Sequence, residues 1–93
     1  MTDMKTNDIL QQIRDEMDPV MKKRMELSVE IANHVFSLLE EKGMSQKDLA
    51  KKMGKSETEV SRWLSGMHNM TIGTIAKLAI ALEDDIIEIR AFR

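Results

Sequence analysis

Polar side chains that can hydrogen-bond recur at helical spacing between residues 57 and 65. Five of them share one face of a predicted helix, at positions i, i+1, i+4, i+5 and i+8: Glu57, Thr58, Ser61, Arg62 and Ser65. Val60, Trp63 and Leu64 would lie on the opposite face, against a core. A helix of this kind suits the DNA major groove, which is about 12 Å wide. There Arg can bind a guanine edge through two hydrogen bonds, Thr can contact a thymine methyl group, and Glu can accept from cytosine N4.

Some of these residues also have a purely structural interpretation. Glu57 and Glu59 lie in a first helical turn, where carboxylates stabilise the helix dipole by about 0.3–1 kcal/mol. Glu59 stands three residues after Ser56, which is the spacing of a capping box, and we expect capping to be its role. For Glu57, dipole stabilisation and base contact are equal alternatives. Arg62 has a solvated surface position as its alternative.

Two helices joined by a short corner are expected to position this polar face. Ser45 and Asp48 have capping-box spacing at the start of the first helix, and Gly54 can take the left-handed conformation that ends it. Ser56 then caps the second helix. A helix that stops and restarts after three residues turns sharply, so the two helices are predicted to cross at a steep angle.

Eight residues of this stretch fall at a fixed spacing: Gln46, Leu49, Ala50, Met53, Gly54, Val60, Trp63 and Gly66. With them the chain resembles the helix-turn-helix of the phage-repressor (Cro-like, XRE) family, over about residues 29–82. It departs from the family pattern at Lys55, where an apolar residue is usual, and at Met70, where proline is common.

The resemblance implies a repressor that binds double-stranded DNA as a homodimer on a pseudo-palindromic operator. Gln46 would bond a phosphate, Lys47 and Lys55 would neutralise phosphates, and the face from Glu57 to Arg62 would meet base edges. Ser65, His68 and Asn69 would follow the DNA backbone. The DNA-binding residues expected on this basis are Gln46, Lys47, Lys55, Ser56, Glu57, Thr58, Ser61, Arg62, Ser65, His68 and Asn69.

Apolar residues at helical spacing predict further helices on both sides, so the expected fold class is all-α, a small helical bundle. Residues 4–17 form an amphipathic segment, and a second helix runs from Pro19 to Lys42 with a break near Leu27 and Ser28. Thr71 caps the last helix. The expected core stripes are Ile9, Leu10, Ile13 and Met17; Met21, Met25, Ala32, Val35, Phe36 and Leu39; Leu49, Ala50 and Met53; and Ile72, Ile75, Ala76, Leu78, Ala79 and Leu82.

These elements suggest three parts: an N-terminal helical extension (1–28), the helix-turn-helix domain (29–82) and a C-terminal tail (83–93). The tail segment from Ile86 to Phe92 is rich in β-branched residues and alternates in part. We expect it to be a short strand that pairs with the same strand of a second copy, since nothing else in the sequence reads as a strand. The alternative is a fifth short helix in a helical dimer interface.

Charge is unevenly distributed along the 93 residues, although the net charge is only −2. Residues 44–82 carry six Lys and Arg against three Asp and Glu, while residues 1–43 carry six against nine and residues 83–93 carry two against four. A basic middle with acidic ends is the pattern that a nucleic-acid footprint on one face would produce, with chance fluctuation as the alternative.

Several classes of protein are disfavoured by the composition. There is no cysteine, which excludes disulfides, thiolate zinc sites and cysteine nucleophiles. No signal peptide or membrane-spanning run is recognisable, so a cytoplasmic protein is expected. No phosphate loop, zinc-protease motif or nucleophile elbow occurs, so we expect no enzyme activity, catalytic residue, metal or cofactor.

The acidic N-terminal extension suggests a second, different function. The layout of extension, helix-turn-helix and short tail, together with "SRWLSGMHNMT", resembles HigA-type antitoxins, whose partner is a small, basic ribonuclease toxin. An acidic surface suits a basic partner. Two alternatives remain: the extension packs on the protein's own core or on a second copy, or the fold is an interaction module that does not bind DNA.

Overall fold

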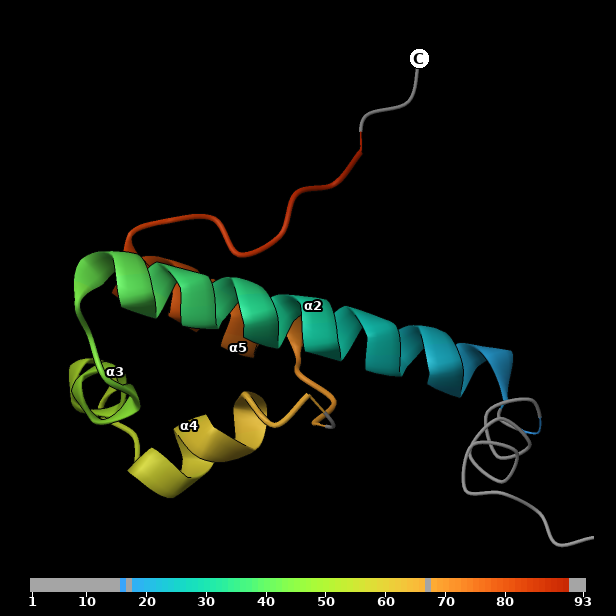
Figure 1. The fold of residues 1–93 in the computed structure, drawn as a ribbon, viewed down its shortest axis with the longest axis horizontal. Helices are drawn as coiled ribbons and strands as arrows, with labels where there is room; N and C mark the ends of the chain where they lie inside the picture. The colour runs from blue at the N-terminus through green and yellow to red at the C-terminus, as the bar shows by residue number, and fades with distance from the viewer. Residues whose placement is uncertain (1–15, 17, 67, 91–93) are drawn as a thin grey trace, which may run out of the picture.

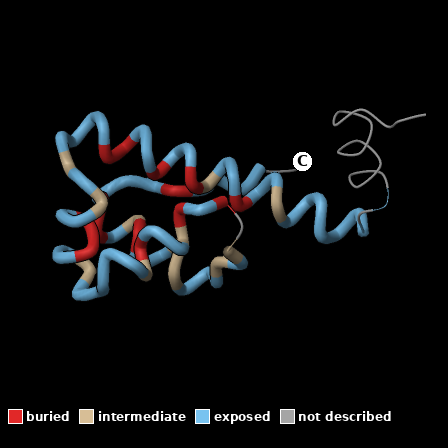
Figure 2. The backbone as a smooth tube through the Cα atoms, turned by 60° about the horizontal axis from the view of Figure 1, so that its bottom comes forward, coloured by how far each residue is buried: buried red, intermediate tan, exposed pale blue. Residues whose placement is uncertain are grey.

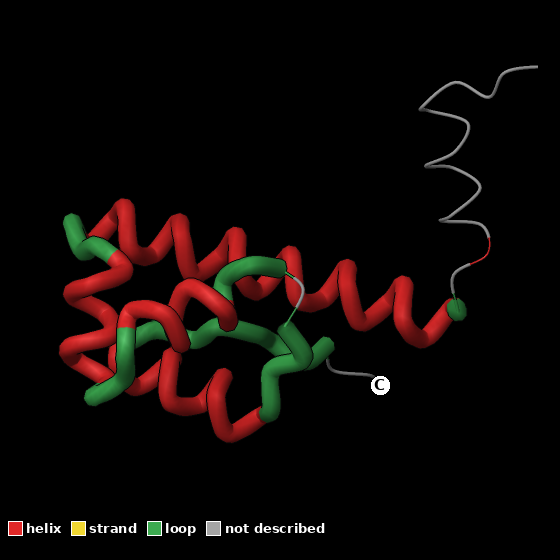
Figure 3. Tube along the Cα trace, turned by 90° about the horizontal axis from the view of Figure 1, so that it is seen from below, coloured by secondary structure: helices red, strands yellow, loops and turns green. Residues whose placement is uncertain are grey.

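The computed structural model describes residues 16, 18–66 and 68–90 of the chain. It contains the helices α2 (Pro19–Lys42), α3 (Gln46–Met53), α4 (Glu57–Trp63) and α5 (Ile72–Leu82) (Figure 1). No strand occurs among the described residues (Figure 3), so the expected all-α fold is confirmed. The expected helix over residues 4–17 lies outside the described residues, apart from Glu16.

The long helix α2 runs for 24 residues without interruption, so the expected break near Leu27 and Ser28 was wrong. Asp18 caps its start by accepting from the Val20 N–H at 2.8 Å, and Pro19 occupies the first turn. Gly43 ends it with a left-handed φ of 63°. Ser28 is tolerated inside the helix because its hydroxyl is buried and donates to the His68 carbonyl at 3.0 Å.

The corner between α3 and α4 forms as the sequence predicts. The Ser45 N–H donates to Asp48 Oδ2 at 2.9 Å, and the Asp48 N–H donates to Ser45 Oγ at 3.0 Å. Hydrogen bonds from the Ser45 backbone and then its side chain hold the pKa of Asp48 below its ordinary value. Gly54 ends α3 with a φ of 67°, and Ser56 Oγ accepts from the Glu59 N–H at 3.1 Å.

The second capping box is only half formed. Ser56 caps α4 as expected, but no bond from the Ser56 N–H to the Glu59 side chain occurs among the described interactions. One satisfied bond already fixes the start of this short helix.

One core holds the helices together, with α3 packed against both α4 and α5. Its fully buried side chains come from every described helix: Val35, Leu49, Val60, Leu78 and Leu82. In Figure 2 the buried residues gather where these helices meet, while the first turns of α2 extend beyond them.

Parts of the expected core stripes are rotated. Phe36 is 40% exposed and Ile72 is 82% exposed, whereas Leu38 and Ala81, which were not expected in the core, are buried. Met21 and Ala76 are exposed as well. The buried face of α2 comprises Ser28, Ala32, Val35, Leu38 and Leu39, with Phe36 at its edge, and the buried residues of α5 are Leu78, Ala81 and Leu82, all after its first turn.

The C-terminal tail is irregular over its described residues 83–90, neither strand nor helix. Neither the expected strand nor the helical alternative forms within a single chain, which offers no second copy to pair with. Instead Ile86 is buried, and His34 Nε2 lies 3.1 Å from the Asp85 carbonyl oxygen. Figure 1 shows the tail leaving α5 and running back along α2.

Gly66 links the end of α4 to α2. Its φ is 81°, a left-handed conformation that side chains rarely adopt, and a Cβ there would lie 3.2 Å from Val29 Cγ2. Glycine at this position therefore lets the loop after α4 approach α2 closely without strain.

We predict that Gly66→Ala lowers the free energy of unfolding by about 1–2 kcal/mol, because alanine is strained at positive φ and would press on Val29. Urea denaturation followed by circular dichroism measures the change.

Gly73→Ala is the matched control. Gly73 lies in α5 without a positive φ, and a Cβ there would meet its nearest neighbour at an ordinary 3.6 Å. Alanine favours the helix there, so this variant should be at least as stable as the parent. Equal stability of the Gly66→Ala variant and the parent would show that the loop has room to relax.

Candidate nucleic-acid interface

The two faces of α4 differ sharply in burial. Val60 is fully buried and Trp63 packs half-buried against the core, while Thr58, Ser61 and Arg62 are exposed. Seven residues of helix suffice for this division because the Ser56 cap fixes one end and buried Leu64 fixes the other. The polar face is thus carried by a helix that is anchored from behind.

The start of α3 and the outer face of α4 form one continuous surface. A shallow, open hollow of about 550 Å³ lies between them, and every residue that lines it is polar: Gln46, Glu57, Thr58, Ser61, Arg62 and Ser65. The α3–α4 corner therefore places Gln46 beside residues that follow it by eleven or more positions. The hollow offers both hydrogen-bond donors and acceptors to a partner.

Three further expected residues lie around the corner itself. Lys47 is exposed in the first turn of α3, and Lys55 and Ser56 are exposed between the two helices. The Ser56 hydroxyl already accepts from the Glu59 N–H, so Ser56 has a structural role whatever else it contacts.

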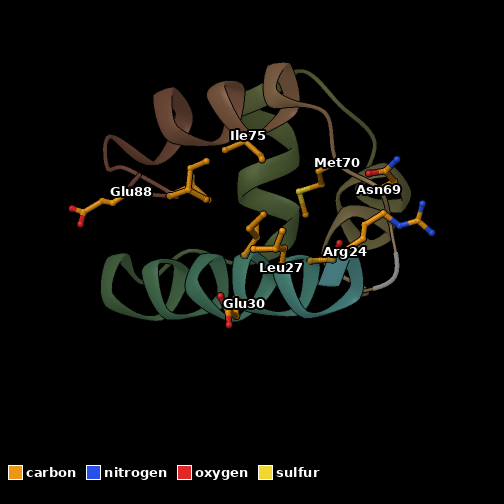
Figure 4. Close-up of a pocket in the computed structure, with 11 residues that line it drawn as sticks. Arg24, Leu27, Glu30, Asn69, Met70, Ile75 and Glu88 are labelled. Carbon is orange, nitrogen blue, oxygen red and sulfur yellow. The ribbon is translucent and has the colours of Figure 1, made fainter. Parts of the chain in front are cut away.

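His68 and Asn69 do not line the hollow. His68 is half-buried and its carbonyl accepts from Ser28, while Asn69 is exposed at a different cleft, beside α2 (Figure 4). The loop that holds them follows α4 and is fixed to α2 rather than to α3. The sequence analysis did not predict that Ser28 holds this loop. A serine within the apolar stripe of a helix could have indicated a buried hydrogen bond.

The basic side chains at this surface form no salt bridge with another described residue. In the part of the chain that the structure describes, the salt bridge is Lys23–Glu26 on α2, at 3.7 Å. Lys47, Lys55 and Arg62 therefore keep their charges available to an anionic partner.

Neither a cluster of metal-ligating side chains nor a membrane-spanning helix occurs among the described residues. No group of three or more His, Asp or Glu side chains there is arranged to hold a metal ion. None of the described helices combines the length and apolar character needed to cross a membrane.

Comparison with known proteins agrees with this geometry. The family model described as helix-turn-helix matches residues 36–83, just over half of the chain, and the match includes α3, the corner and α4. No curated protein and no solved structure gives a significant match. The chain therefore belongs to the XRE, or Cro-like, helix-turn-helix family of DNA-binding transcription regulators.

Proposed function

We propose that the protein is a cytoplasmic repressor that binds a pseudo-palindromic operator as a homodimer, with one α4 in the major groove of each half-site. Residues 29–82 would be the DNA-binding domain. The observation that carries the proposal is the polar hollow shared by α3 and α4, on a helix whose other face is buried in the core. Occupancy of the operator would be enough to repress.

The expected contacts follow from side-chain chemistry. Arg62 would read a guanine edge and Thr58 a thymine methyl group, while Gln46 would bond a phosphate from the start of α3. Lys47 and Lys55 would neutralise phosphates without reading sequence. Glu57 lies in the same hollow, and its role stays open between base contact and stabilisation of the α4 dipole.

The tail is proposed to hold the two copies together. Ile89 is 89% exposed in the single chain, although it is large and apolar. Antiparallel pairing with the same segment of a second copy would cover this side chain and supply partners for the backbone. A two-fold pair could set the α4 helices near the roughly 34 Å spacing of successive major-groove half-sites.

DNA reading is tested by comparing Arg62→Ala and Thr58→Ala with Lys55→Ala. Each of the first two should reduce discrimination between operator and scrambled DNA by about 1–3 kcal/mol for a well-made base contact. Lys55→Ala should weaken both DNAs alike and make the slope of log K against log salt shallower by about 0.9. Fluorescence anisotropy over a salt series measures all three.

The outcomes of this comparison are separable. Equal weakening of both DNAs by Arg62→Ala would make Arg62 a phosphate contact. If the binding affinity of the unmodified protein did not depend on salt, the proposed DNA binding would be refuted.

The tail's role is tested by truncation after Ile86, which keeps the buried isoleucine and its anchor to α2. We expect the shortened chain to sediment as a monomer and to bind the operator more weakly. Ile89→Pro should weaken the dimer in the same direction, because it removes one amide donor. A truncated protein that remains a dimer with full operator affinity would exclude the tail from the interface.

A second candidate function, a type II antitoxin that neutralises a ribonuclease toxin and represses its own operon, is favoured by the first turns of α2. Val20 is 75% exposed and Met21 is 45%, and the first turns of the helix extend beyond the core (Figure 2). Exposed apolar groups next to one another suit a protein partner.

The antitoxin function predicts that Val20→Ser/Met21→Ser abolishes co-purification with a ribonuclease toxin encoded beside this chain and leaves operator binding intact. Lys22→Gln, on the same helical turn, is the control and should retain the toxin. Retention of the toxin by the double serine variant would exclude this surface as its binding site.

A further inference from the structure

A second concave region lies on the far side of the loop that follows α4. It is a cleft of about 530 Å³ between the middle of α2, the start of α5 and the tail. Six apolar side chains line it: Leu27, Ile31, Met70, Ile75, Ile86 and Ile87. Figure 4 shows Leu27 rising from α2 toward the gap, with Ile75 and Met70 facing it from the other side.

The walls of this cleft are fixed by specific contacts. Ile86 is buried, and the tail beside it is tied to α2 by the contact of His34 Nε2 with the Asp85 carbonyl oxygen. At the other wall, buried Ser28 lines the cleft and donates to the His68 carbonyl. The cleft is thus part of the built structure, with a volume inside the range of roughly 300–1,000 Å³ usual for small-ligand sites.

Two polar groups that can donate hydrogen bonds lie together at one end of the cleft. In Figure 4 the Arg24 guanidinium and the Asn69 amide lie at the outer rim of that end, and the carboxylates of Glu30 and Glu88 lie away from it. Arg24 forms no salt bridge with another described residue. A guanidinium with an amide beside it is the donor set that binds a carboxylate.

We propose that the cleft binds a small amphipathic carboxylate, whose aliphatic chain lies on the apolar walls and whose head group is bound by Arg24 and Asn69. The apolar lining favours an unbranched or lightly branched hydrocarbon chain, because six of the residues that line the cleft are large and apolar. The site is distinct from the polar hollow, and binding there does not depend on DNA.

A ligand in the cleft would contact the loop that follows α4 and could thereby affect that helix. Asn69 and Met70 line the cleft and belong to the loop that follows α4, and Ser28 of the same cleft holds the His68 carbonyl. Next to Ser28, Val29 faces Gly66 at the end of α4. A ligand that displaces this loop would shift the end of α4. This part of the inference rests on the proposed DNA-binding function.

The site is tested with decanoate, below its micelle concentration, by isothermal titration calorimetry on the full chain. We expect saturable binding of one decanoate per chain, with octanoate about tenfold weaker because two buried methylene groups are lost. Arg24→Gln should weaken decanoate about tenfold and leave decanol unchanged, since only the carboxylate uses the charge. Lys22→Gln, on the same helix but outside the cleft, is the matched control.

Filling the cleft provides the second variant. Ile31→Trp should abolish decanoate binding while circular dichroism and the urea midpoint report that the chain still folds; if it fails to fold, Leu27→Trp, at a more exposed position, takes its place. Decanoate binding that survives in a folded, filled variant, or no saturable binding by the unmodified protein, would overturn the site. A filled variant that loses its dimer, with no decanoate binding by the parent, would identify the cleft as an interface between copies.

The link to DNA is read separately. Saturating decanoate should lower operator affinity at least fivefold in the unmodified protein, and the Arg24→Gln variant should need about tenfold more decanoate for the same loss. Operator affinity unaffected by a saturated site would overturn the coupling and leave the binding site standing. Absence of any operator binding, with decanoate still bound, would instead refute the proposed function alone.

Discussion

Two helix ends only three residues apart must satisfy their unpaired backbone groups within a few ångströms, and the rest of the molecule depends on how this is done. Gly54 turns the chain through a left-handed conformation, which lets the Lys55 N–H reach the Ala50 carbonyl at 2.9 Å. Ser56 then supplies the first acceptor of α4. With both ends satisfied locally, α4 can be as short as seven residues and still hold a fixed angle to α3.

The long helix α2 has a different role, as the element to which the irregular segments are attached. Ser28 holds the loop after α4, Val29 faces Gly66, and His34 contacts the backbone of the tail. These contacts join residues 37 to 51 positions apart, and each involves a backbone group or a glycine rather than a second helix. Segments without regular structure are thereby given a defined place along one rigid rod.

Local chemistry made the corner predictable from the sequence, because capping residues act on backbone groups within a few positions. Ser45, Gly54 and Ser56 were each assigned correctly, and so was the separation of Val60 from Thr58. Which face of α2 is buried was not fully predictable. Apolar residues lie on several sides of the helix near Phe36, and packing against the neighbouring helices decides which of them are buried.

Long-range contacts account for what sequence reasoning missed. A β-branched tail predicts a strand, but the contact of His34 with Asp85 and the burial of Ile86 depend on α2 lying alongside, which no local pattern encodes. Likewise Ser28 and His68 are forty positions apart, so their bond could not be inferred, nor could the position of Asn69, expected to follow the DNA backbone, at a cleft beside α2. The DNA contacts themselves remain predictions.

The division of α4 into a buried and an exposed face also bears on how such a protein evolves. Thr58, Ser61 and Arg62 are exposed, so exchanging them leaves Val60 and Leu64 in place and costs little folding stability. Mutations that alter what this surface recognises are thus uncoupled from mutations that threaten the fold. After gene duplication, two copies could therefore diverge toward different targets by a handful of substitutions, each intermediate still a folded protein exposed to selection.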